Sequence, residues 1–264
     1  SIEETMLENL KELYRFRSLV KALVVRHLAM RYRGSVLGFL WSFLNPLCLM
    51  LVYSLVFSYY IRFNSVDHYT IFLFCGLLPW IWVSSGLAEG ATAIVSSGHL
   101  ITKSMFPAHI LPAVSVLTTM INFLLSLPLL FLFMWVAGMQ FHITLLLLPV
   151  LIALQLLFLH GLALALSSLN VHFRDVQHIV GNVLTFLFFL CPILYPVSTV
   201  PERFRFTLDY NPLALFTLGY HQLILDGVVP SLSAFVVMGV SVLVVSWFGH
   251  AVFARYHESF AELL

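Results

Sequence analysis

The sequence predicts an all-α integral membrane protein with six transmembrane helices, an N-terminal interfacial amphipathic helix, and re-entrant outer helices between spans five and six. The first observation is the composition: 61% of the residues are hydrophobic and 9% are charged, whereas soluble domains carry about 25% charged residues. The second is an uncharged stretch at 36–61, longer than the about 20 apolar residues that cross a bilayer. The third is the seven basic residues at positions 11–33, directly before it. Because Lys and Arg are retained in the cytoplasm, they orient the N-terminus inward.

Residues 1–35 are expected to form the cytoplasmic interfacial helix. Arg17 and Lys21 interrupt its apolar side, so an ordinary juxtamembrane basic segment is the alternative. The apolar residues that recur at spacings of three and four are Leu10, Leu13, Val20, Leu23, Val24 and Leu28, and the opposite side carries Lys11, Arg15 and Arg26.

Residues 36–254 are expected to form the transmembrane domain, followed by a cytoplasmic tail at 255–264. A kink is expected at Asn45–Pro46, because proline removes a backbone donor. With the N-terminus inside, ten basic residues lie on the inner side and three, Arg62, Arg203 and Arg205, on the outer side, so both termini are predicted to be cytoplasmic. The six spans are expected at 36–61, 69–95, 110–137, 143–169, 179–195 and 232–254.

The segment 197–230 is too long and too apolar for a plain loop, yet its apolar run is too short to cross the bilayer. Pro201, Pro212 and Pro230 divide it. Two short helices that enter the outer leaflet and return fit these lengths, since non-helical backbone is tolerated in a membrane where protein satisfies it.

The chain lacks the motifs of most catalytic classes. It has no GxxxxGK[ST] phosphate loop, no HExxH and no GxSxG, and Cys48, Cys75 and Cys191 have no metal-binding or redox spacing. Ionisable residues inside membrane spans usually mark a functional site. The expected spans contain almost none, and Glu89 is the exception. A chain that moves a substrate without its own charge relay or nucleotide site must be driven by a partner.

Five segments, in order, resemble type-2 ABC exporter permeases, and the Wzm-type permeases that export O-antigen polysaccharide in particular. The resemblance covers nearly the whole chain. The segments are 31–38 (RYRGSVLG) with Trp41 and Asn45–Pro46, 100–103 (LITK) with Phe106–Pro107 and Leu111–Pro112, 173–176 (FRDV), 192–196 (PILYP), and Asn211–Pro212.

The resemblance implies a bacterial inner-membrane half-transporter. Two copies of this chain would pair, and two separate ABC ATPase subunits would dock below them and bind ATP and Mg²⁺. The implied substrate is a polysaccharide linked to undecaprenyl diphosphate, surrounded by membrane lipids. No cofactor and no nucleic acid is expected to bind this chain, and no catalytic residue or metal site is expected in it.

Aromatic residues are the expected lining of the route, because sugars stack their apolar C–H faces on aromatic rings. A lipid-facing or interfacial position is the alternative for each of them. The candidates on span one are Tyr53, Phe57, Tyr59 and Tyr60, and those on span five are Phe186, Phe188 and Phe189.

Two inner loops are expected to couple the chain to the ATPase. A short helix at 97–108 would offer Lys103, Phe106 and Pro107, and the second loop would offer Arg174 and Asp175. A plain solvated turn is the alternative.

The outer region is expected to form an exit gate with Tyr195, Arg203 and Arg205 near its mouth. Guanidinium groups match phosphate oxygens, so the two arginines could contact the diphosphate. The alternative is that they pair with Glu202 and Asp209.

Other functions also remain open from the sequence. One is a type-2 ABC permease for teichoic acid, capsule, drug or small-lipid export. Another is a membrane scaffold or a lipid-modifying enzyme with an unrecognised site.

Overall fold

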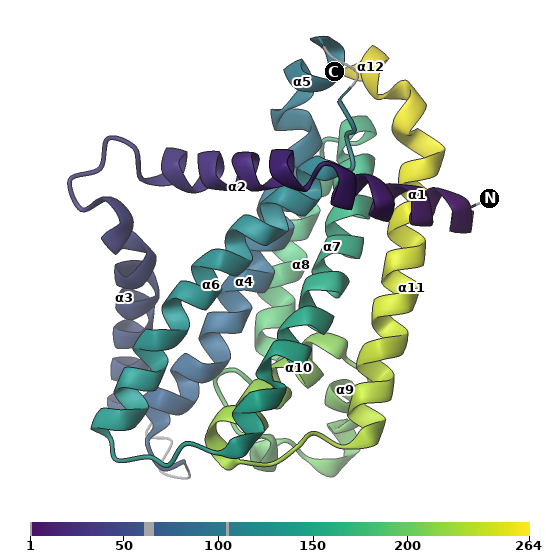
Figure 1. Cartoon of the computed structure of the whole chain (residues 1–264). Coiled ribbons are helices and arrows are strands. Elements are labelled where there is room, and N and C mark those ends of the chain that lie inside the picture. Colours follow the sequence, from purple (N-terminus) through teal and green to yellow (C-terminus); the bar gives the residue numbers. More distant parts are fainter. Residues whose placement is uncertain (1, 61–65, 104–105) are drawn as a thin grey trace.

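The chain forms a bundle of long helices, crossed near one end by two N-terminal helices (Figure 1). The computed structural model describes residues 2–60, 66–103 and 106–264; within these ranges there is no strand, so the all-α expectation is confirmed. The α-helices of this part of the chain are α1 (Ile2–Arg15), α2 (Arg17–Tyr32), α3 (Trp41–Leu55), α4 (Tyr69–Ser96), α5 (Gly98–Lys103), α6 (Ile110–Val136), α7 (Leu148–His172), α8 (Val176–Leu190), α9 (Phe206–Asp209), α10 (Pro212–His221), α11 (Leu232–Tyr256) and α12 (Phe260–Leu263).

Within the described residues, five helical segments are long and apolar enough to cross a membrane, so the expected count of six spans is not confirmed. They are Gly38–Leu55, Tyr69–Thr102, Ile110–Val136, Ile143–His172 and Leu232–Leu263. The expected fifth span, 179–195, is instead the 15-residue helix α8, which ends at Leu190. At 1.5 Å per residue, such a helix falls short of the about 30 Å hydrocarbon core. It stops there because Cys191 precedes a proline and is extended (φ −95°, ψ 143°), as residues before proline usually are.

Helix α4 is the centre of the bundle. It packs against α6 and α7 along much of its length and also touches α3, α8 and α10. Of its span, 72% is buried, against 11% for the span that contains α3. The side chains of Leu73, Phe74 and Ala91 are fully enclosed. The core of the protein therefore surrounds α4, while α3 lies at its edge.

Small residues allow the backbones of α4, α7 and α11 to approach closely. A Cβ atom added to Gly90 of α4 would lie 2.7 Å from that of Ala163 on α7, and one added to Gly161 of α7 would lie 2.9 Å from the Ser246 backbone of α11. A Cβ on Gly249 would fall on the carbonyl oxygen of Gly161. Small residues at such contacts are typical of membrane helices, which associate through close packing because lipid offers no hydrophobic driving force.

The N-terminal residues form two helices, with a break at Phe16. Val24 of α2 is buried against Ile110 and Val114 of α6, and the neighbouring apolar residues Leu13, Val20, Leu23 and Leu28 pack around them. The apolar residues of the two N-terminal helices therefore pack, at least partly, on α6. Helix α1 contacts α11, so the pair crosses the whole bundle (Figure 1).

A short connection links the end of α2 to α3. It contains Gly34 and Gly38, both at positive φ (78° and 48°). Glycine adopts this conformation without a Cβ penalty. The helix continues through Pro46, the position of the expected kink, and passes into a π-helical turn at Val56–Tyr60. Most of the surface of α3 is left without a partner within one copy of the chain.

The segment after α8 returns into the bundle as α10. Asn211 begins this helix: its side-chain oxygen accepts a hydrogen bond from the Leu213 N–H (3.1 Å), and proline occupies the next position, as expected at a helix start. The ring of Tyr220 meets Phe123, near the middle of α6, at 5.7 Å between centroids. Helix α10 is therefore buried among α4, α6 and α7 rather than lying on the bundle surface.

The α7–α11 contact generates a stability prediction. Replacing Gly249→Ala should lower the free energy of unfolding by about 1–3 kcal/mol, because the added methyl group meets backbone that cannot move aside. The measurement is denaturant-induced unfolding in mixed micelles. Gly239→Ala, on the same helix with open space around its Cα, is the matched control and should leave stability unchanged or raise it. Equal stabilities of the two variants would contradict the packing described here.

Candidate functional site

An aromatic groove opens between α3, α4 and α8 and encloses about 610 Å³. Its rings come from Tyr53, Trp80, Phe188 and Phe189. Tyr53 and Phe188 stack at 6.0 Å between centroids, and Trp80 lies 5.8 Å from Phe188. Phe189 meets Phe188 edge-on at 5.2 Å. Three of the expected lining residues, Tyr53, Phe188 and Phe189, are thus brought together.

Hydroxyl groups lie between the aromatic rings of the groove. Ser84 and Ser85 both donate to the carbonyl of Ile81 (3.2 and 2.5 Å), and Thr185 donates to that of Gly181 (3.0 Å). None of the described residues that line the groove is charged. Such a surface offers ring faces and hydroxyl oxygens to a ligand without a strong charged anchor.

The other four expected aromatics do not line the groove. Phe57 packs between Tyr53 and Tyr69 instead. Tyr59 and Tyr60 lie in the π-helical turn and are 74% and 75% exposed, and Phe186 is 71% exposed on another side of α8.

The second span was expected to line the route together with spans one and five, but Trp80 of α4 was not among the expected lining aromatics. Trp80, Ser84 and Ala88 recur every fourth residue, which places them on one face of a helix, and all three line the groove. This spacing is visible in the sequence. The aromatic residues expected from the sequence lie on spans one and five alone, so this face of span two was not among them.

The first expected coupling loop contains a helix, but a shorter one than predicted. Helix α5 covers Gly98–Lys103 rather than 97–108, and Phe106 and Pro107 are not helical. Residues 104–105 lie outside the described ranges. Proline disfavours helical geometry at the preceding residue, which explains why Phe106 does not continue the helix. The Phe106 side chain packs beside Leu13 and Val24 of the N-terminal helices, so it faces the bundle side of this loop.

The second expected coupling loop is the turn between α7 and α8. Arg174 and Asp175 are both exposed there. Asp175 precedes α8 without accepting a capping hydrogen bond; Asn170 instead accepts one from the Gln177 N–H (3.3 Å). Both charged side chains are thus exposed at the end of the bundle where α7 joins α8.

The segment 257–264 joins the two coupling loops. Phe260 is 1% exposed and packs in a cluster with Ile94 and Val171. Leu264 covers Gly98, the first residue of α5, while the Ser259 hydroxyl lies 2.9 Å from the His172 ring at the end of α7. One short segment therefore touches both loops (Figure 1 shows α5 and α12 together).

The three expected exit-gate residues do not form one cluster. The Tyr195 hydroxyl donates to the Phe189 carbonyl (2.9 Å), which ties it to the end of α8 beside the groove. Arg203 lies over the ring of Phe204 at 4.8 Å, and Arg205 is exposed. Within the described residues, neither arginine forms an ion pair with Glu202 or Asp209. Arg62 lies outside the described residues.

Glu89, the exceptional acid of the spans, is paired with Arg31 at the end of α2. One guanidinium nitrogen lies 2.6 and 2.8 Å from the two carboxylate oxygens. His27, one turn earlier on α2, has its pKa lowered by burial and by the neighbouring Arg26 and Arg31 charges. Arg31 thus fastens the end of the N-terminal helices to α4.

Comparison with known proteins identifies the family. Residues 18–225 match the family described as ABC-2 type transporter. This chain belongs to that family. The matched part contains α2 to α10, and therefore the aromatic groove, α5, the 173–175 turn and the Arg31–Glu89 pair.

Relatives of this ABC-2 type transporter include proteins named for polysaccharide export. An O-antigen export system permease protein RfbA of Myxococcus xanthus is 41% identical, over 97% of this chain and 99% of the relative. One of the same name from Klebsiella pneumoniae is 31% identical over 97% and 100%. The polysialic acid transport protein KpsM of Escherichia coli is 29% identical over 74% and 76%. The family expected from the sequence motifs is confirmed.

The Arg31–Glu89 pair generates a prediction for this transporter. Arg31→Gln and Glu89→Gln should each lower the free energy of unfolding by about 0.2–1 kcal/mol, since both side chains are about a third or more exposed. The double variant should lose less than the sum. Thermal unfolding in detergent measures all three. Arg26→Gln, a change of an exposed arginine on the same helix, should have no effect on stability. If the effects of the two single changes add exactly in the double variant, the two charges do not stabilise the fold through their interaction.

Proposed function

We propose that this ABC-2 type transporter is the permease subunit of an exporter of lipid-linked, O-antigen-like polysaccharide, driven by a separate ATPase. The observation that carries the proposal is the 41% identity, over essentially the full length of both chains, to an O-antigen export system permease. The aromatic groove supports it, because ring faces mixed with hydroxyls suit a sugar chain that must slide without tight binding. Undecaprenyl diphosphate is the proposed lipid carrier.

The exposed helices support a homodimer as the working form. Only 11% of the span that contains α3 is buried, and Phe186 and Phe189 of α8 are exposed. The groove lies between these two helices and is open on that side. A second copy facing it would enclose a route between the two subunits, and Tyr53, Phe188 and Phe189 would line it with Trp80.

The coupling surface supports an ATPase partner that binds ATP and Mg²⁺. Lys103 ends α5, and Arg174 and Asp175 lie in the exposed turn nearby. We assign these residues, with Phe106 and Pro107 behind them, to ATPase contact. The exposed pair Arg203 and Arg205, with Tyr195, remains assigned to the outer exit gate, where the arginines would steer the diphosphate.

The proposed location is the bacterial inner membrane, with both termini in the cytoplasm. In this arrangement α8 completes a sixth crossing together with residues 191–196, which the Tyr69 hydroxyl holds through the Leu194 carbonyl (2.6 Å). Helix α10 is the re-entrant helix, and its burial beside Phe123 supports that assignment.

A capsule-type polysaccharide is the second candidate substrate, and the similarity to the polysialic acid transport protein favours it over a drug or small lipid. Co-purification with an ABC ATPase, followed by export of lipid-linked glycan in vesicles, tests the proposal. Absence of an ATPase partner, or ATP-dependent export of a small molecule in place of glycan, would overturn it.

The homodimer proposal gives a cross-linking prediction. In a Cys48→Ser background, which removes the exposed one of the three cysteines, Phe186→Cys should form disulfide-linked dimers in membranes, detected on non-reducing gels. Val180→Cys, buried on the same helix, should not. Dimers from both positions in equal yield would indicate random collision, and their absence from Phe186→Cys would remove α8 from the interface.

The contacts of segment 257–264 give a coupling prediction. Phe260→Ala should leave a cavity under α5 and the end of α7, so that less glycan is exported per ATP hydrolysed. Vesicle export and ATP hydrolysis measured together test this. The matched control, Leu263→Ala, changes an exposed side chain of the same helix (47% exposed) and should have no effect. An unchanged ratio in Phe260→Ala, at normal protein level, would exclude a coupling role for this segment.

A further inference from the structure

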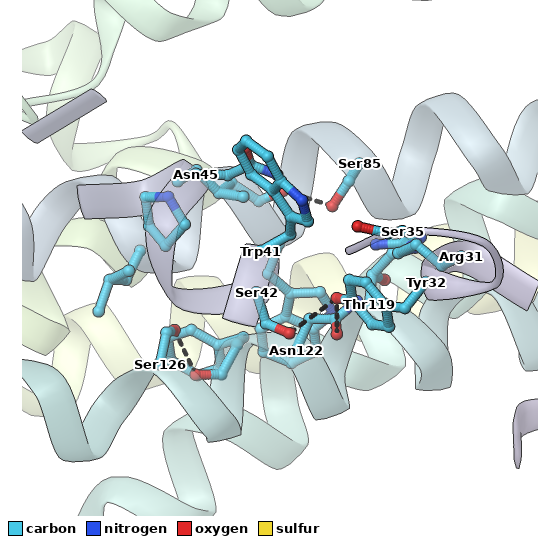
Figure 2. Close-up of a pocket in the computed structure, with 15 residues that line it drawn as sticks. Arg31, Tyr32, Ser35, Trp41, Ser42, Asn45, Ser85, Thr119, Asn122 and Ser126 are labelled. Atoms are coloured by element: carbon cyan, nitrogen blue, oxygen red, sulfur yellow. Dashed lines mark hydrogen bonds between the residues drawn. The ribbon is translucent and has the colours of Figure 1, made fainter. Parts of the chain in front are cut away.

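A polar cavity of about 390 Å³ lies between α3, α4 and α6, under the end of α2 (Figure 2). It is distinct from the aromatic groove, which lies between α3, α4 and α8, although Ile81 and Ser85 contribute to both. Its volume falls within the about 300–1,000 Å³ of small-molecule sites. We refer to it as the α3–α6 cavity.

Neutral hydrogen-bonding side chains are concentrated in the α3–α6 cavity. Three helices, α3, α4 and α6, contribute them, in a chain of which 61% is hydrophobic. Placing polar groups inside a membrane bundle is costly unless they have partners, so such a concentration calls for a polar occupant. The hydroxyl and amide residues are Ser42, Asn45, Ser85, Thr119, Asn122 and Ser126.

Three hydroxyl protons of this cavity are already donated to backbone carbonyl groups. Ser85 donates to the Ile81 carbonyl (2.5 Å), Thr119 to that of Val116 (2.9 Å) and Ser126 to that of Phe123 (2.6 Å). A hydroxyl oxygen that donates its proton still has lone pairs to accept with. The walls therefore offer hydroxyl oxygens that can accept, and the buried Asn122 amide nitrogen, which has no hydrogen-bond partner among the described residues, adds a donor. A ligand whose hydroxyl groups both donate and accept suits this combination.

The charge distribution disfavours an anion in the cavity. Arg31 is the one charged residue among the described side chains that line it, and both carboxylate oxygens of Glu89 already neutralise it at 2.6 and 2.8 Å. A diphosphate, which only accepts hydrogen bonds, could not use the hydroxyl oxygens of Ser85, Thr119 and Ser126, whose protons are already donated to the backbone. An uncharged polyhydroxyl ligand meets no such conflict.

One aromatic ring of the cavity remains open for stacking. Trp82 is 1% exposed and lies flat against Phe123 (5.2 Å between centroids, 14° between planes). Trp41, at the start of α3, is 40% exposed and stands over the polar residues in Figure 2. An indole face beside acceptor oxygens matches the two sides of a sugar ring, its C–H face and its hydroxyl edge.

We propose that the α3–α6 cavity binds one sugar unit of the exported glycan, with the ring on Trp41 and the hydroxyls on Ser85, Thr119 and Asn122. This inference rests on the proposed polysaccharide substrate and adds a site in each subunit apart from the groove. Asn122 has a further role: its amide oxygen accepts from the Tyr32 hydroxyl (3.3 Å), which connects the site to the N-terminal helices.

The test uses tryptophan fluorescence of the permease–ATPase complex in lipid nanodiscs. The probes are D-glucose, D-mannose, D-galactose, N-acetyl-D-glucosamine and L-rhamnose, with sodium diphosphate as the anionic probe. At least one sugar should change the emission, and Trp41→Phe should abolish the change, while Trp247→Phe, a change of an exposed tryptophan of α11 that lines neither the cavity nor the groove, should keep it. A response to diphosphate alone, a response that survives Trp41→Phe, or no response to any sugar would overturn the proposal.

Variants of the polar wall supply the second measurement. Thr119→Val and Asn122→Leu should each weaken sugar binding about fivefold or more, the usual effect of one lost hydrogen bond. Thr118→Val is the matched control: its hydroxyl makes the same kind of bond, to the Val114 carbonyl (2.7 Å), but does not line the cavity. Unchanged affinity in both wall variants would overturn the site, and Thr119→Val serves if Asn122→Leu fails to fold.

Glycan export by the wild-type complex separates the two hypotheses. Suppose that the wild-type complex exports glycan and that both wall variants keep full export and full sugar affinity. This outcome would exclude the cavity site and leave the proposed function standing. Absence of glycan export in wild type, in a complex that hydrolyses ATP, would remove the proposed function itself.

Discussion

Direct backbone contact among α4, α7 and α11 is the constraint on which the rest of this structure depends. Lipid is as apolar as a leucine side chain, so burial of apolar surface does not draw membrane helices together. Here small residues replace that driving force: Gly90 meets Ala163, and Gly161 meets Ser246 and Gly249. The close contacts fix three helices as one unit, and the remaining helices are arranged around it.

This arrangement places the aromatic groove at the boundary between the fixed and the loosely packed parts. One wall is α4, the most enclosed span, and the others are α3 and α8, which have large exposed surfaces. The α3–α6 cavity shares this design, because α3 is again its least packed wall. A displacement of α3 would change the width of both spaces at once while α4 stayed in place. The Arg31–Glu89 pair lies at the end of α2, next to the connection that leads into α3.

Sequence reasoning predicted what depends on composition and local pattern. Charge asymmetry and apolar runs predicted the helical membrane class, and the spacing of residues such as Val20 and Val24 predicted the packed face of the N-terminal helices. It failed where long-range neighbours decide. Arg31 and Glu89 are 58 positions apart, and nothing local links them. Phe106 was expected in a loop that contacts the ATPase, and its packing against Val24, Ile110 and Val114 of the same chain could not be predicted from local pattern. Helix α8 ends at Leu190 because Pro192 makes Cys191 extended. The sequence analysis used Pro192 to place the end of span five near 195, but not to shorten the helix.

The burial of α10 has a consequence for biogenesis. Its neighbours α4, α6 and α7 are synthesised before it and its neighbour α11 after it, and N-terminal parts of a chain generally fold first during synthesis. At ten residues, α10 is too short to be inserted as a span in its own right. It therefore enters a site that earlier helices have already shaped, where His221 lies against Gly76 and beside the Phe72 carbonyl (3.0 Å). The order of synthesis thus gives an order of assembly: α4, α6 and α7 form three sides of the site, α10 enters it, and α11 closes it afterwards.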